Sequence, residues 1–157
     1  MSQSLQEATS HGLEQFASPL TAAVISGWVL EKCTSHLRQA SEIAEDSQER
    51  QFWLRHQQLD SMIAKILMSL PDHLRASSTR EPLAFFVNMC FHEFTISIFQ
   101  AAILVAQKSP SRFDTVARLR SRARRAAEQI VDIMRLGAYM DIRLVSRKVQ
   151  VNWKYSH

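Results

Sequence analysis

Glycine and proline are scarce in this sequence, which has three glycines and four prolines in 157 residues. The glycines stand apart at Gly12, Gly27 and Gly137. Phosphate-cradling loops and nucleophile elbows need clustered glycines, because the backbone must approach the ligand closely. Nucleotide enzymes and hydrolases of that kind are therefore not expected. Apart from glycine and proline, the composition is rich in the helix formers leucine, alanine, glutamine and arginine, which favours a few long helices over many strands.

Cysteine is also scarce, and no spacing suits a metal. Cys33 and Cys90 are far apart, and the polar N-terminus carries no apolar leader segment, so we expect free, buried thiols in a reducing compartment. Cys90 and His92 would point roughly 200° apart on a helix and cannot share one ion. His92 and Glu93 begin like a zinc-protease motif, but Ile96 stands where the second histidine belongs. We expect no metal and no cofactor, and interpret His92 as a core or groove histidine.

Periodic apolar residues predict an all-α fold of four main helices near 19–44, 49–70, 82–108 and 112–136, with less than a tenth of the chain in strand. One domain is expected over 18–144, between a loose lead at 1–17 and a tail at 145–157. The residues predicted to face the core are Leu20, Val24, Gly27, Trp28 and Leu37 in the first helix, Phe52, His56, Leu59, Ile63, Ile66 and Leu70 in the second, and Val116, Leu119, Ala123, Ala127, Ile130 and Met134 in the fourth.

The third predicted helix is apolar on nearly all sides and long enough to cross a bilayer. The polar residues Asn88, His92, Glu93 and Gln100 interrupt it, and a carboxylate in mid-membrane is costly, so we interpret it as the central helix of the domain. Glu93 is the carboxylate most open to a pKa change by burial, or to pairing with a cation of the fourth helix. With His92 and Asp60 it forms no convincing catalytic set, so no enzyme and no small-molecule substrate are predicted.

The end of the chain changes pattern. Gly137 is placed to terminate the fourth helix. Beyond Leu144, apolar residues alternate with polar ones through Val149 and Val151 to Trp153. This alternation predicts a strand-like tail that has no obvious strand to pair with.

Charge is distributed unevenly along the chain, whose net charge is +4. Residues 1–60 hold eight acidic and four basic residues, whereas 112–148 hold ten basic and four acidic ones. The two ends could attract each other, or the basic end could meet an acidic partner.

Five arginines crowd into the segment 117–125. At helical spacing Arg118, Arg122 and Arg125 form one ridge, and Arg120 and Arg124 lie on another. A nucleic-acid helix and a nuclear-import segment would be similarly basic. The segment lacks interleaved aromatic residues, so we favour a solvated face or a contact face for an acidic partner, centred on Arg118, Arg122 and Arg125.

Three segments, at 52–75, 88–108 and 119–135, carry loose motifs in a fixed order. Their residues are Trp53, Arg55, His56, Leu70, Pro71, Leu74 and Arg75, then Asn88, Met89 and His92, then Ala126, Ala127 and Ile130. Together they resemble the regulatory, or middle homology, domain of the fungal-specific zinc-cluster transcription factors. The segment 27–39 is also similar, and the resemblance covers about three-quarters of the chain.

The resemblance implies an all-helical domain in the nucleus that regulates DNA binding and does not perform it. In that family DNA is contacted through a six-cysteine cluster that holds two zinc ions, and two cysteines cannot build one. The segment 146–157 departs from the family's continuing helix. We therefore expect a fragment or shortened form of the regulatory domain, acting through a protein partner or by self-association, with no membrane role. The alternatives are an interaction module, or a non-functional gene remnant, without a role in transcription.

Overall fold

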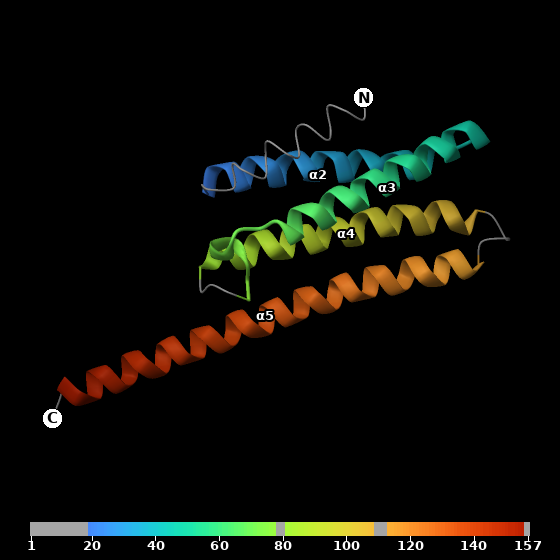
Figure 1. The fold of residues 1–157 in the computed structure, drawn as a ribbon. Coiled ribbons are helices and arrows are strands. Elements are labelled where there is room, and N and C mark those ends of the chain that lie inside the picture. Colours follow the sequence, from blue (N-terminus) through green and yellow to red (C-terminus); the bar gives the residue numbers. More distant parts are fainter. Residues whose placement is uncertain (1–18, 78–80, 109–112, 156–157) are drawn as a thin grey trace.

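The computed structural model describes residues 19–77, 81–108 and 113–155, with side chains described over 21–77, 81–108 and 114–139. This part contains α2 (Pro19–Glu42), α3 (Asp46–Met68), the short 3-10 helix η1 (Asp72–Leu74), α4 (Pro82–Gln107) and α5 (Phe113–Tyr155), and no strand (Figure 1). The all-α prediction and its four main helices are confirmed. The predicted lead at 1–17 lies outside the described residues.

Local sequence explains where two of the helices begin. Gln48 Oε1 accepts hydrogen bonds from the backbone N–H groups of Ala44 (2.9 Å) and Glu45 (3.3 Å), and Asp46 places a negative charge in the first turn of α3. The charged segment 45–50 is thus mainly the solvated first turn of a helix. Pro82 starts α4 at a position where its missing N–H costs no hydrogen bond.

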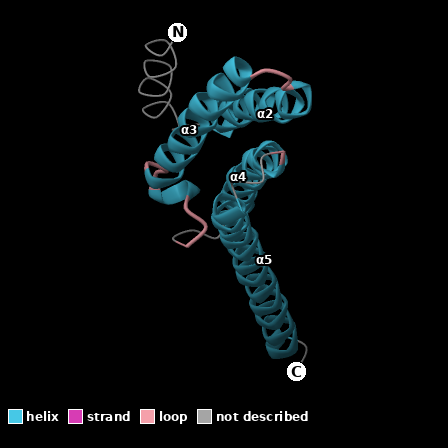
Figure 2. Cartoon of the chain, turned by 90° about the vertical axis from the view of Figure 1, so that its right-hand side faces the viewer, coloured by secondary structure: helices cyan, strands magenta, loops and turns pink. Residues whose placement is uncertain are grey.

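The centre of the domain is α4, as predicted. It packs against α2, α3 and α5, with α2 and α3 together on one side and α5 on another (Figures 1 and 2). Phe91, Ile98 and four alanines of α4 are completely buried. By length and composition α4 is also the one described helix that could cross a membrane, but 44% of its apolar window is buried inside the protein.

The core-facing side predicted for α3 is confirmed in full. Its six members are all buried, with exposed fractions between 1% and 8%: Phe52, His56, Leu59, Ile63, Ile66 and Leu70. A large apolar side chain gains roughly 1.5–3 kcal/mol on burial, so this side holds α3 onto α2 and α4.

The side predicted for α2 is wrong at three positions: Val24, Gly27 and Leu37 are exposed, whereas Trp28 packs against the core as predicted and the side chain of Leu20 lies outside those described. Val24 is 63% exposed and Leu37 is 37% exposed, whereas Val29, Cys33 and His36 are buried. The buried face of α2 consists mainly of small residues, Ala22, Ser26, Cys33 and Ala40 among them. Small side chains let two helices approach closely, and a count of large apolar residues does not register them.

The end predicted for α5 is also wrong. The helix continues through Gly137 to Tyr155, and no described glycine has a positive φ, so Gly137 does not form a left-handed cap. The strand-like tail is replaced by helix, because a period-two pattern needs a neighbouring strand and the described residues contain none.

The buried side of α5 differs from the prediction in its later turns. Ala126 and Ile133 are buried where Ala127 and Met134 were expected, and Met134 is 60% exposed. The predicted positions average 3.6 residues per turn, whereas Leu119, Ala126 and Ile133 recur every seven residues. A seven-residue repeat is the spacing of helices that wrap around each other, so α5 follows α4 as in a coiled coil.

Candidate interaction surface

The predicted contact arginines lie on one flank of α5, and one of them is engaged inside the protein. Arg122 Nη2 donates to both carboxylate oxygens of Asp60 on α3, at 2.9 and 3.2 Å. Its guanidinium carbon lies 5.2 Å from the ring centroid of Phe99 on α4. This flank of α5 therefore faces α3. Arg118 and Arg125 share the flank and are exposed.

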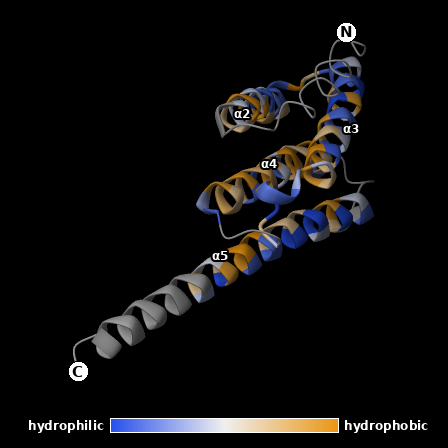
Figure 3. Ribbon diagram, turned by 60° about the vertical axis from the view of Figure 1, so that its left-hand side comes forward, coloured by the Kyte–Doolittle hydropathy of each residue, from blue (hydrophilic) through white to orange (hydrophobic). Residues whose placement is uncertain are grey.

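The arginines at 118, 120, 124 and 125 form no ion pair with any described residue. Arg120 and Arg124 lie on the opposite flank of α5 from Arg122, as the helical period requires. Hydrophilic residues accordingly dominate the first half of α5, whereas α4 is mainly hydrophobic (Figure 3). These four guanidinium groups, unpaired within the described residues, make this part of α5 an electropositive surface.

One side of α4 is left open by its three neighbours. Phe86 is 57% exposed and Leu104 is 48% exposed, and Glu93 and Gln100 between them are exposed as well. This contradicts the expectation that Glu93 is buried: α4 is apolar on most sides, but Glu93 lies on the side that no other described helix covers.

The open side of α4 lies between α5 and α2. Around α4, α2 packs against α3, and α3 is joined to α5 by Arg122 and Asp60. α5 and α2 make no comparable contact within the described residues. Within the described residues, the gap between them is therefore the side on which α4 is exposed.

A buried aromatic cluster joins α2, α3 and α4, and the sequence did not reveal it. The His36 ring stacks on Phe52 at a centroid distance of 4.2 Å, His56 lies 5.6 Å from His36, and Phe99 meets His56 edge-on at 4.9 Å. These residues are far apart in sequence, and only folding brings them together. Their spacing carried no signal except that His56 belongs to the apolar side of α3.

Burial keeps both histidines of this cluster neutral. His36 is 0% exposed, and neither of its ring nitrogens has a hydrogen-bond partner in the described residues. Burial, then His56 and Arg55, lower the pKa of His36 to about 3. Burial also lowers the pKa of His56, against the opposing effect of Asp60. The lowered pKa values favour the neutral form of both imidazoles near neutral pH, and we interpret the cluster as part of the packed core.

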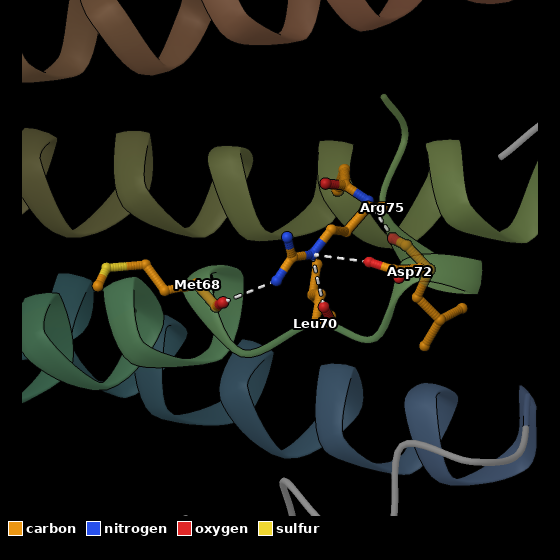
Figure 4. A network of polar contacts seen from close by, with 6 residues as sticks. Met68, Leu70, Asp72 and Arg75 are labelled. Atoms are coloured by element: carbon orange, nitrogen blue, oxygen red, sulfur yellow. Dashed lines mark hydrogen bonds and ion pairs between the residues drawn. The ribbon is translucent and has the colours of Figure 1, made fainter. Parts of the chain in front are cut away.

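The corner between α3 and α4 explains several residues of the family-like motifs (Figure 4). Arg75 donates from Nε to the Leu70 carbonyl (2.7 Å) and from Nη2 to the Met68 carbonyl (3.2 Å), which satisfies the end of α3. Asn88 on α4 donates to the Leu74 carbonyl at 2.6 Å. The Leu-Pro-x-x-Leu-Arg segment and the asparagine that follows it therefore build a structural corner.

The remaining candidates for chemistry are weak. A groove between α2 and α3, lined by Gln39, Glu42, Gln51 and Phe52 among others, has a volume of about 160 Å³. Ligand pockets usually measure roughly 300–1,000 Å³. Among the residues with described side chains, no group of three or more histidine, cysteine or acidic residues could hold a metal ion.

Neither thiol is activated, and His92 lies at the edge of the core. Burial raises the pKa of Cys33 to about 12, and burial together with Glu93 raises the pKa of Cys90. Both thiols are therefore protonated near neutral pH, which makes them poor nucleophiles. Both cysteines are free, as expected. His92 is half-buried and its pKa is lowered by burial, which suits a groove position.

Comparisons of this chain with protein-family models, with curated proteins and with solved structures find no match. Function must therefore be argued from the residues themselves. The open side of α4 and the exposed arginines of α5 are surface features that make no extensive contact within the described residues.

Proposed function

We propose that this chain is a non-catalytic protein-interaction domain that acts in transcription regulation in the nucleus, as a fragment or shortened form of the regulatory domain that it resembles. The observation that carries the proposal is the open side of α4, where Phe86 and Leu104 remain exposed beside an electropositive helix. Exposed apolar side chains next to unpaired charge are typical of a surface that another protein covers.

The chemistry of the described residues supports a role without catalysis. The buried histidines are held neutral, both thiols are protonated, and the groove between α2 and α3 is small. An active site usually brings perturbed ionisable groups together in a pocket, and here those groups lie within the packed core.

Direct reading of DNA is not part of the proposal. Sequence is read by side chains that reach base edges in a groove, whereas exposed arginines without such partners contact phosphates. Any binding of DNA by α5 should be independent of sequence and be lost at moderate salt.

A tethering experiment tests the proposed function. The whole chain is fused to an unrelated DNA-binding domain and directed to a reporter gene in yeast nuclei. We expect reporter transcription to change, and a Phe86→Glu, Leu104→Glu double variant to abolish the change. The matched control is Leu54→Glu, because Leu54 is 62% exposed on α3, away from the open side. Circular dichroism verifies that each variant folds.

A reporter that does not respond to the folded fusion protein would contradict a role in transcription. It would leave the interaction module without such a role, or the non-functional remnant, as the function of the chain.

Self-association is the second candidate, and the same exposed residues favour it. A second copy could cover Phe86 and Leu104. In that case the sedimentation coefficient rises with protein concentration, and Phe86→Glu reduces this rise. A monomer at every concentration would exclude it.

A further inference from the structure

The flank of α5 that faces away from α3 carries a regular ridge. Its members are spaced by four, three, four and three residues and are all exposed: Arg120, Arg124, Ala127, Val131 and Met134. We call these five residues the outer ridge. Alternating steps of three and four residues form a seam on which a second helix can pack. α5 uses the same spacing on its buried side, where Val116, Leu119, Ala123 and Ala126 follow one another at steps of three, four and three residues.

The outer ridge borders the open side of α4. Arg122 fixes which flank of α5 faces α3, because it pairs with Asp60. The outer ridge lies on the other flank and hence faces the gap between α5 and α2, where Phe86 and Leu104 are exposed. A helix laid in this gap would contact α4 and α5 together and would complete the packing around α4.

We propose that this gap binds an amphipathic acidic helix of a partner protein. Acidic side chains of the partner would pair with Arg120 and Arg124, and its apolar side chains would cover Val131. This inference rests on the proposed role as an interaction domain and adds the chemistry of the partner. The charge complementarity comes from the outer ridge, which contains two arginines and no acidic residue, whereas Glu93 on the open side of α4 carries the same charge as the partner.

The apolar half of the outer ridge favours a protein over a nucleic acid. Val131 is 43% exposed and Met134 is 60% exposed, and phosphate groups would gain nothing from covering them. A second copy of the same ridge is also a poor fit. Pairing two outer ridges would leave Arg120 and Arg124 without opposite charges, whereas an acidic helix satisfies both halves of the ridge.

The test uses synthetic helical peptides and the full chain. One peptide repeats a heptad with leucine on its apolar seam and glutamate beside it, and its counterpart carries glutamine in place of glutamate. By fluorescence anisotropy at physiological salt we expect the acidic peptide to bind at least about tenfold tighter than the neutral one. Arg120→Glu with Arg124→Glu should abolish this preference. Arg118→Glu with Arg125→Glu is the matched control, because it makes the same charge change on the other flank and should weaken binding by less than about threefold.

A second pair of substitutions tests the apolar half. Val131→Gln with Met134→Gln changes no charge and alters only exposed side chains, so the helix should fold as before. We expect this pair to weaken binding of the acidic peptide by about tenfold or more.

Several outcomes would overturn the inference. These are no binding of the acidic peptide by the folded wild-type chain, or equal losses for both arginine pairs. A third is a double-stranded DNA oligonucleotide that binds more tightly than the peptide and does not respond to Val131→Gln with Met134→Gln, which would identify a phosphate-binding face. Peptide binding without any reporter response would support the docking surface and contradict only the role in transcription.

Discussion

Replacing His36 with leucine should make the protein more resistant to acid. His36 is completely buried, stacks on Phe52, and has two ring nitrogens without a hydrogen-bond partner in the described residues. Its pKa falls from about 6.5 to about 3 on folding, chiefly because of burial. Since the folded pKa is the lower one, the unfolded chain takes up the proton first. Stability is therefore intact above about pH 6.5 and is lost as the pH falls from there toward 3.

The size of the effect follows from the two pKa values. Between about pH 7 and pH 5 the unfolded imidazole becomes protonated while His36 in the folded chain does not, which lowers the free energy of unfolding by about 2 kcal/mol. Leucine is close to histidine in volume and carries no nitrogen. It loses the ring stacking but removes unpaired polar atoms, whose burial costs about 1–3 kcal/mol, so at pH 7 we expect a change within about 1 kcal/mol of the wild type.

Urea unfolding followed by circular dichroism at the two pH values measures this. The His36→Leu variant should lose about 2 kcal/mol less than the wild type between about pH 7 and pH 5. His73 is exposed on η1, so His73→Gln is the control and should keep the wild-type acid response. An equal loss of stability in His36→Leu and in the wild type would refute the reasoning, because it would mean that His36 is protonated in the folded chain.

Three further predictions concern stability and are measured by the same unfolding assay. Phe91→Ala should cost about 3–5 kcal/mol because Phe91 is completely buried, whereas Phe86→Ala, 57% exposed on the same helix, should change stability by about 0.5 kcal/mol or less. Equal losses of stability in the two variants would contradict the orientation of α4, in which Phe91 faces the core and Phe86 does not. Arg75→Ala should cost about 1–2 kcal/mol by leaving two carbonyls at the end of α3 unsatisfied, and no loss would mean that water replaces the guanidinium. Asp60→Asn should cost only about 0.2–1 kcal/mol, since the pair with Arg122 is partly exposed, and the cost should shrink at high salt.

Sequence was a good guide to α3 and a poor one to α2, for one physical reason. The buried side of α3 consists of large apolar residues such as Phe52 and Ile63, which stand out at helical spacing. On α2 the large residues Val24 and Leu30 are exposed, and the buried side is marked mainly by small residues. Which side of a helix is buried depends on how closely its neighbours approach, and this is decided by the whole fold.

The later part of α5 shows a different limit. Gly137 resembled a terminator, but a glycine inside a helix costs only about 1 kcal/mol, which the neighbouring turns can offset. The alternation around Val149 and Val151 suits a strand only if another strand is present to pair with it. Local patterns of this kind are decided by tertiary partners, which a single sequence does not reveal.

Candidate site residues were located only in part. The split of the arginines between two flanks of α5 followed from helical period and is what the structure has, but Arg122 turned out to be paired with Asp60. Glu93 could not be placed, because α4 is so apolar that its period does not show which side is left open. The contact between His36 and Phe52 likewise depends on how α2 and α3 pack.

The contacts of α5 determine the order in which parts of the domain unfold locally. Among the described residues, α5 packs extensively on α4 alone and is linked to α3 by the pair of Arg122 and Asp60. Within the described residues α5 contributes Val116 and Leu119 to the core cluster, and most other members come from α2, α3 and α4, so α5 can detach as one cooperative unit at a lower free energy than global unfolding requires. Amide hydrogens of α5 should thus exchange before those of α4. A helix bound across α4 and α5 would oppose this detachment, so that recognition and the local stability of α5 become thermodynamically linked.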